Sequence, residues 1–130
     1  MKVRIWIIIL ITLSLIGLVI VEQIYVTNTI DFMKAQSNEI LETIQTNENI
    51  NSVDFINKIN DLDEKWTKKE STLCLIVNHK DMEKVGEQIQ KLKVLIVQNR
   101  KEEAEYEANL LVYYVDGYEH FISVTFQNIF

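Results

Sequence analysis

The sequence predicts an all-α protein, in which an N-terminal transmembrane helix continues into an extracytoplasmic antiparallel four-helix bundle. The chain of 130 residues has no proline and only three glycines, so few residues interrupt long helices. Residues 5–21 carry no charge, and Lys2 and Arg4 stand directly before them. Beyond this run, apolar residues recur at spacings of three and four, which is the pattern of amphipathic helices.

The uncharged run from Ile5 to Val21 has seventeen residues, with Gly17 inside it. A helix rises about 1.5 Å per residue and the hydrocarbon core of a bilayer is roughly 30 Å thick, so this run lies at the short end of a membrane span. Trp6 marks one boundary of the span, and Tyr25 suits the interface at the other boundary.

Two other interpretations fit a run of this kind less well. A cleaved signal peptide has an apolar region of about 7–15 residues followed by a small-residue cleavage site, whereas the first alanine here is Ala35. A core helix that is apolar on all sides needs other elements to surround it. Nothing in the rest of the chain could surround such a helix. We therefore expect a membrane anchor over residues 1–26 and a helical domain over residues 27–130.

Charges beside the run predict its orientation. Basic residues stay on the cytoplasmic side of a membrane. Lys2 and Arg4 flank the N-terminal end of the run, whereas Glu22 and Asp31 come before Lys34 at the other end. We expect a single-pass protein of the cell membrane, with its N-terminus in the cytoplasm and its C-terminal domain outside.

The first two helices follow from apolar stripes. The first should continue from the span to about Thr46, where polar residues provide a break. The second should begin at Asn51 or Ser52, both of which are good caps. Only Ser37 and Lys69 interrupt the stripes, and these interruptions leave room for a homo-oligomer. The stripes are Val26, Ile30, Met33, Ile40 and Ile44, then Phe55, Ile59, Leu62, Trp66, Leu73 and Ile76.

The last two helices follow a turn at residues 78–81. Asn99 should end the third helix, and its spacing to Glu102 resembles a capping box for the fourth. A strand over residues 120–126 is the alternative at the end of the chain, because that stretch is β-branched and aromatic. The two stripes are Met82, Val85, Ile89, Leu92 and Ile96, then Ala104, Ala108, Leu111, Val115, Tyr118 and Ile122.

Short connections between these helices predict antiparallel neighbours. The first helix would leave the membrane and the second would return to it. The turn around His79 and the C-terminal residue Phe130 would then both lie near the bilayer. Phe130 would contact the membrane interface or, alternatively, close the bottom of the core.

The residues predict no catalytic site. The chain has two histidines and one cysteine, and a catalytic zinc site needs three protein ligands. The acidic residues from Glu102 to Glu107 lie at a helix N-terminus, which stabilises acids without any further role. We therefore expect no enzyme activity, no cofactor and no metal. Cys74 lies between apolar residues, which favours a buried thiol; an intermolecular disulfide is the alternative.

Net charge limits the choice of partner. The whole chain has a net charge of −6 at pH 7, and an acidic surface disfavours nucleic acid and anionic lipid headgroups. The expected partners are the lipid bilayer and another membrane protein. Tyr114 and Tyr118 are one helical turn apart and form either a contact surface or part of the core.

Several short patterns occur together along the chain, namely Glu22-Gln23-Ile24-Tyr25, Trp66 with Lys69-Glu70, Asn78-His79 and the terminal Asn128-Ile129-Phe130. In these patterns the chain resembles a family of short, single-span membrane proteins of unknown function from clostridia-like spore-forming bacteria. The resemblance implies a Gram-positive cell membrane, a role in sporulation and association with a multi-pass membrane protein. It transfers no activity and no catalytic residue.

The sequence therefore predicts a membrane-anchored, non-catalytic interaction or scaffold protein. The alternative is a helical bundle that senses a small ligand and acts through a membrane partner. The residues that we expect to mediate interaction are Trp66, Asn78, His79, Tyr114, Tyr118 and Phe130.

Overall fold

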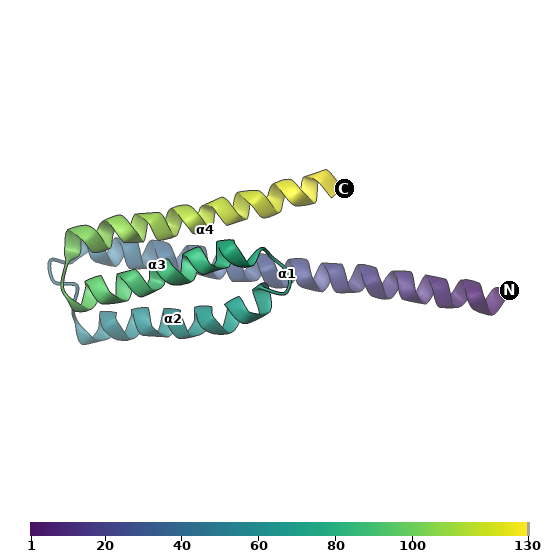
Figure 1. Ribbon diagram of the computed structural model, residues 1–130, viewed down its shortest axis with the longest axis horizontal. Helices are drawn as coiled ribbons and strands as arrows, with labels where there is room; N and C mark the ends of the chain where they lie inside the picture. Colours follow the sequence, from purple (N-terminus) through teal and green to yellow (C-terminus); the bar gives the residue numbers. More distant parts are fainter. Residues whose placement is uncertain (130) are drawn as a thin grey trace.

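The computed structural model describes the backbone of residues 1–129 and the side chains of residues 1–120; Phe130 lies outside the described residues. Four helices make up the described chain, α1 (Lys2–Thr46), α2 (Val53–Leu73), α3 (His79–Val97) and α4 (Lys101–Ile129) (Figure 1). Residues 1–129 contain no strand, so the predicted all-α class is confirmed. The alternative of a strand over residues 120–126 is wrong, because α4 continues to Ile129.

Helix α1 is unbroken over 45 residues, as the sequence predicted. Its first half extends alone beyond the other helices (Figure 1), and Val26 is its first buried residue. Among the described residues, α1 is the one helix long and apolar enough to cross a membrane, and none of its most apolar stretch is buried in the protein.

Apart from Ile76, and from Ile122, which lies outside the residues whose side chains are described, the predicted stripes form a single core to which all four helices contribute. Trp66 is the largest of the fully buried side chains. Helix α4 packs against both α1 and α3, and α3 packs against α2; of the helix pairs in contact, α1 and α2 have the smallest contact. This arrangement is a helical bundle.

Both residues that interrupt the stripes lie at helix contacts within the bundle. Ser37 is fully buried, and its hydroxyl donates to the Met33 carbonyl at 2.7 Å. The Lys69 ammonium lies 5.3 Å from the ring centroid of Phe32 and 5.8 Å from that of Tyr25, across the loose seam between α1 and α2. Neither residue therefore marks an open face, and the homo-oligomer stays a prediction without this support.

The ends of α2 and α3 differ in part from the prediction. Ser52 caps α2 as expected, because its hydroxyl accepts from the Phe55 amide at 3.3 Å. Helix α2 ends at Leu73, so Ile76 is exposed and does not extend the core stripe. Asn78 caps α3 by accepting from the Lys80 amide at 3.2 Å, and α3 therefore begins at His79 within the predicted turn.

Asn99 does not form the predicted capping box. Its φ of 55° is in the left-handed region, and the Arg100 amide donates to the Leu95 carbonyl at 2.9 Å, so Asn99 terminates α3. Its side-chain oxygen accepts from the Ile50 amide at 2.8 Å. Asn99 therefore joins the α3–α4 connection to the α1–α2 connection.

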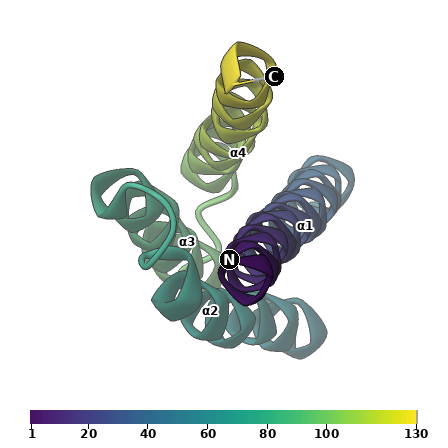
Figure 2. The same ribbon diagram turned by 90° about the vertical axis from the view of Figure 1, so that its right-hand side faces the viewer.

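The α2–α3 turn lies beside the point where α1 leaves the bundle, and the other two connections lie at the opposite end (Figure 1). Helix α4 diverges from α1 toward its C-terminal end (Figures 1 and 2). Lys34 of α1 forms an ion pair with Glu119 of α4, with its ammonium 2.5 Å from a carboxylate oxygen.

Candidate functional site

A groove between α2 and α3 has Trp66 in its wall. Its volume is about 300 Å³. We call it the acidic groove, because four of the residues that line it are carboxylates. The lining residues are Asp63, Trp66, Thr67, Glu70, Glu83, Gly86, Glu87 and Gln90.

The groove follows from helical spacing on α2 and α3, which are joined by a short turn. Asp63, Trp66 and Glu70 recur at intervals of three and four along α2, so they share one face. On α3, the groove residues Glu83, Gly86, Glu87 and Gln90 are also three or four residues apart, so they share the face that is turned toward α2. Gly86 brings the α3 backbone close to Trp66, since a Cβ on Gly86 would lie only 3.3 Å from the indole Nε1.

The indole N–H of Trp66 is a buried donor without an acceptor. The side chain is 1% exposed, and Nε1 has no hydrogen-bond partner in the described part of the chain. Buried indole N–H groups normally find an acceptor, because leaving a buried donor unpaired costs about 1–3 kcal/mol. The wall of the groove therefore presents an unused donor.

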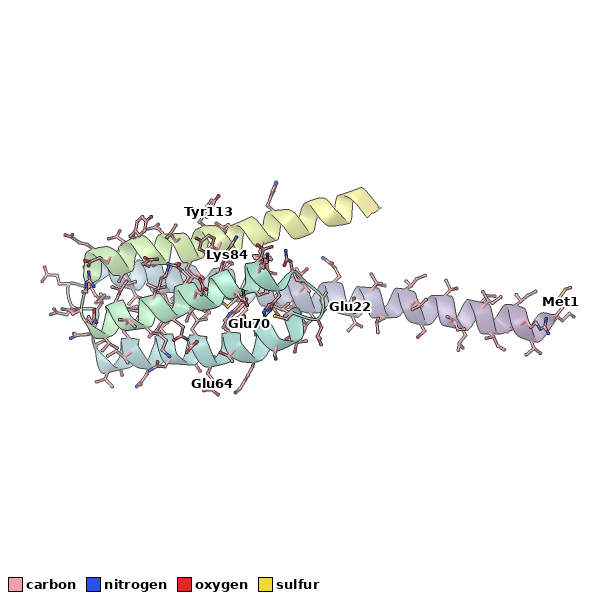
Figure 3. The ribbon with its side chains drawn as sticks, in the orientation of Figure 1. Met1, Glu22, Glu64, Glu70, Lys84 and Tyr113 are labelled. Atoms are coloured by element: carbon pink, nitrogen blue, oxygen red, sulfur yellow. The ribbon has the colours of Figure 1, made fainter. Side chains whose placement is uncertain are left out.

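The carboxylates of the groove are unequally neutralised. Asp63 accepts from Lys93 at 2.6 Å and from Gln90 at 2.7 Å. Glu83 contacts His79 at 2.8 Å. Glu70 and Glu87 form no ion pair with a described side chain, and Figure 3 shows Glu70 between α2 and α3. Burial raises the pKa of the Glu70 carboxyl; the nearby His79 opposes this increase and Glu83 adds to it.

The groove continues toward the α2–α3 turn through a short polar chain. Cys74 Sγ lies 3.0 Å from His79 Nδ1, and His79 Nε2 lies 2.8 Å from a Glu83 oxygen. This geometry fits an imidazole that accepts from the thiol and donates to Glu83. Burial raises the pKa of the Cys74 thiol, and the charges of Glu70 and Glu83 raise it further. The thiol is therefore held protonated rather than activated.

The prediction of a buried Cys74 thiol was only partly right. The side chain is half-buried rather than enclosed, because α2 ends one residue earlier, at Leu73.

A second groove of about 290 Å³ lies on the other side of α3 and holds the two predicted tyrosines. Tyr118 is 8% exposed, and its hydroxyl has no hydrogen-bond partner among the described residues. Tyr114 is half-buried, whereas its neighbour Tyr113 points away from the bundle (Figure 3). We call it the tyrosine groove; its lining residues are Asp81, Lys84, Tyr113, Tyr114, Gly117 and Tyr118.

The predicted interaction residues thus fall into two groups. Trp66 lines the acidic groove, and His79 belongs to the polar chain that extends from it. Asn78, next to His79, caps α3. Tyr114 and Tyr118 lie together in the tyrosine groove. Apart from Trp66, the residues that line the acidic groove were not predicted from the sequence as interaction residues. For Gly86 and Glu87, the only signal was their spacing from Glu83 on one face of α3.

Among the described residues, no group of three or more histidine, cysteine, aspartate or glutamate side chains is placed to hold a metal ion. The expectations of no enzyme activity and no cofactor stay predictions.

Comparison with known proteins places most of the chain in one family model. Residues 20–129 match the model of a family described as a domain of unknown function (DUF4363). The match confirms the predicted membership of an uncharacterised family. No curated protein and no solved structure matches the chain.

Proposed function

We propose that this chain, which belongs to the DUF4363 family, is a non-catalytic, single-pass protein of the cell membrane. In this proposal its antiparallel bundle lies on the extracytoplasmic side and docks with another membrane protein. The end of the bundle nearest the anchor is the docking end. Restriction to a membrane surface raises the effective concentration of the bundle for a neighbouring partner.

The observation that carries the proposal is the continuity of α1. The same helix is exposed and apolar over residues 5–21 and forms one wall of the core from Val26 onward. An exposed apolar surface of this length is unfavourable in water, and a bilayer would remove it. Because the helix has no break, the anchor would hold the bundle at a fixed distance from the membrane.

Contacts across the α1–α2 seam support a membrane-facing α2–α3 turn. Lys69 lies level with the stretch between Tyr25 and Phe32. Antiparallel helices rise equally, so Leu73 at the end of α2, four residues beyond Lys69, lies about level with Ile24 and Tyr25, and Leu75 follows it in the turn. Leu75 is 85% exposed. An apolar side chain at this height suits the membrane interface or a membrane partner.

Helix α4 reaches beyond this level. The Lys34–Glu119 ion pair joins α1 to α4 ten residues before Ile129. The end of α4 extends past the α2–α3 turn toward the N-terminal end of α1 (Figure 1). Two parts of the bundle, the α2–α3 turn and the end of α4, would thus face the membrane beside the anchor.

A topology experiment tests the first part of the proposal. Alkaline phosphatase, which is active only outside the cytoplasm, and a fluorescent protein that folds only inside it are fused separately to the C-terminus of the full chain. We expect phosphatase activity in a membrane fraction that resists carbonate extraction. Fluorescence without phosphatase activity, or release of the chain by carbonate, would contradict the proposal.

Site-specific photo-crosslinking tests the docking end. A photoreactive residue replaces Leu75 at the membrane-proximal turn or, as the matched control, Glu48 in the distal α1–α2 connection, which is also exposed. We expect Leu75 to give a discrete protein adduct in native membranes and Glu48 to give none. Equal crosslinking at both positions, or lipid adducts alone at Leu75, would count against a docked membrane protein.

A ligand-sensing bundle is the second candidate function. Two observations favour it, because each groove contains a buried polar group without a described partner, Trp66 Nε1 in one and the Tyr118 hydroxyl in the other. Ligand sites of helical bundles lie between helices in this way.

A further inference from the structure

We propose that the acidic groove binds a small organic ammonium ion that also carries a neutral hydrogen-bond acceptor, as amino alcohols and amino sugars do. This inference rests on the second candidate function and is independent of membrane docking. Three features of the groove define the ligand: an unused donor, an excess of negative charge and the space opposite Gly86.

The unused donor is the indole N–H of Trp66, which is 1% exposed and has no acceptor among the described residues. It faces Gly86, where a Cβ would lie only 3.3 Å from Nε1, so any side chain at this position would press against the donor. The Glu70 carboxylate is close to the same point, with Oε2 3.7 Å from the position that a Cβ on Gly86 would occupy. A ligand at this point would meet the donor and a carboxylate together.

The charge of the groove selects a cation. Lys93 compensates Asp63, and His79 contacts Glu83. Glu70 and Glu87 form no ion pair with a described side chain, and the remaining lining residues are uncharged. An ammonium group, which is a donor only, suits two carboxylates. A carboxylate or phosphate ligand would be repelled.

The geometry favours an organic cation over a metal ion. No described cluster has the three ligands that hold a metal, and Trp66 offers a donor, which a metal ion cannot use. A hydroxyl or carbonyl oxygen near the ammonium can accept from the indole while the ammonium contacts Glu70. A groove of about 300 Å³ is at the lower limit for ligand sites, which suits a small molecule.

Two sources of this chemistry are possible in a membrane protein. One is a free amino alcohol or amino sugar, and the other is the ethanolamine headgroup of a lipid. Glu70 lies one helical turn from Cys74 and is therefore the groove residue of α2 nearest the membrane-facing turn. A lipid headgroup would enter at the Glu70 end of the groove, and a free molecule would enter from the side that faces solvent.

The indole proton of Trp66 gives a direct readout. The chain has two tryptophans, so Trp6→Phe leaves Trp66 as the single indole signal in a ¹H–¹⁵N spectrum of the full chain in detergent micelles. Ethanolamine and glucosamine are titrated, each against its N-acetyl derivative, which lacks the positive charge. We expect a saturable shift with at least one ammonium compound and binding at least about tenfold weaker for its N-acetyl form.

Variants assign the binding to the groove. Glu70→Gln and Glu87→Gln should each weaken binding about tenfold by removing a charged contact, and Gly86→Ala should block it by filling the space before the indole. Glu48→Gln, which removes an exposed charge from the distal connection, is the matched control and should bind normally. Equal binding by Glu48→Gln and Glu70→Gln but weaker than wild type would show general charge attraction and overturn the site.

The source is distinguished in lipid nanodiscs without added ligand. A shift in phosphatidylethanolamine discs that is absent from phosphatidylglycerol discs identifies the lipid headgroup. A shift only on adding the free compounds identifies a soluble ligand. If neither lipid nor free ammonium compound moves the Trp66 signal, the groove binds no such cation and the proposal is wrong. The docking proposal is then unaffected, because no partner protein takes part.

Discussion

The indole Nε1 of Trp66 lies 3.3 Å from the position that a Cβ on Gly86 would occupy, so these two residues set the approach of α2 and α3. A contact of this length is tight, and the Trp66 side chain is 1% exposed. The ring can therefore move little to relieve it. This close approach limits what can replace the glycine.

The first prediction compares Gly86→Ala with Gly117→Ala. Both glycines lie in helices, where alanine is favoured by about 0.5–1 kcal/mol. A Cβ on Gly117 would meet nothing within 4 Å, so Gly117→Ala should raise the free energy of unfolding by about that amount. Gly86→Ala should gain less or lose stability. Urea unfolding of the full chain in micelles, followed by circular dichroism, measures both; an equal gain would mean that Trp66 moves freely.

The second prediction concerns Glu70→Gln and pH. Burial raises the pKa of Glu70 above its ordinary value of 4.5, so ionisation of this group opposes folding. Stability contributed by protonated Glu70 is lost as pH rises from 4.5 through the folded pKa. Glu70→Gln should therefore be more stable than the wild-type chain at pH 7, with the difference disappearing below pH 4.

Thermal unfolding at several pH values measures this difference. Glu48→Gln controls for the loss of one negative charge from an acidic chain, because Glu48 is exposed in the distal connection. The same stabilisation in both variants at pH 7 would assign the effect to net charge rather than to the burial of Glu70.

The third prediction concerns the reactivity of Cys74. Burial and the charges of Glu70 and Glu83 raise the pKa of its thiol, and only the thiolate reacts with alkylating reagents. The intact chain should therefore be alkylated by iodoacetamide at pH 8 more slowly than a free cysteine. Glu70→Gln should accelerate the reaction by removing one of these charges.

Mass spectrometry of timed samples gives the alkylation rate at this single cysteine. Urea-unfolded chain supplies the reference rate, and Glu48→Gln should react like the wild-type chain. Alkylation of the folded chain as fast as the unfolded chain would show that Cys74 is not held protonated by its surroundings.

The helices and most of the core could be predicted from sequence, because helical periodicity is a local signal. Ile40, Ile59 and Ile89 lie within the predicted stripes, and all three are fully buried. Trp66 was also placed correctly. Ile76 was not, because its position in the stripe gave no sign that α2 ends at Leu73.

The acidic groove could not be predicted in the same way. Glu83 and Glu87 look like a solvated face when α3 is read alone, and Gly86 looks like a weak point in the helix. Their meaning depends on the register of α3 against α2, which places Gly86 opposite Trp66. That register is set by contacts distant in sequence, as is the position of Lys69 over Phe32.

Asn99 shows how a local motif can mislead. The spacing from Asn99 to Glu102 favoured a capping box, but the tight connection after α3 requires a left-handed residue, which asparagine tolerates better than most. The same side chain then supplies an acceptor to the Ile50 amide at 2.8 Å. Two requirements that lie far apart along the chain, a backbone conformation and a buried donor, are met by one residue.

The fourth prediction separates these two contributions of Asn99. Asn99→Ala should remove the acceptor of the Ile50 amide, which costs about 1–3 kcal/mol for a buried donor. It should also strain the left-handed backbone by roughly 1–2 kcal/mol. Asn99→Gly keeps the backbone conformation and loses only the acceptor, so it should fall between Asn99→Ala and the wild-type chain. Urea unfolding of the full chain in micelles ranks the three.

Hydrogen exchange at the Ile50 amide identifies the cause of any loss. Ile50 is 1% exposed, and its amide should exchange faster in both variants because each lacks the acceptor. Asn99→Asp retains an acceptor and tolerates the left-handed region, so it should protect the amide and preserve most of the stability. If Asn99→Gly were as unstable as Asn99→Ala while Asn99→Asp stayed protected, the hydrogen bond alone would determine the stability of this end of the bundle.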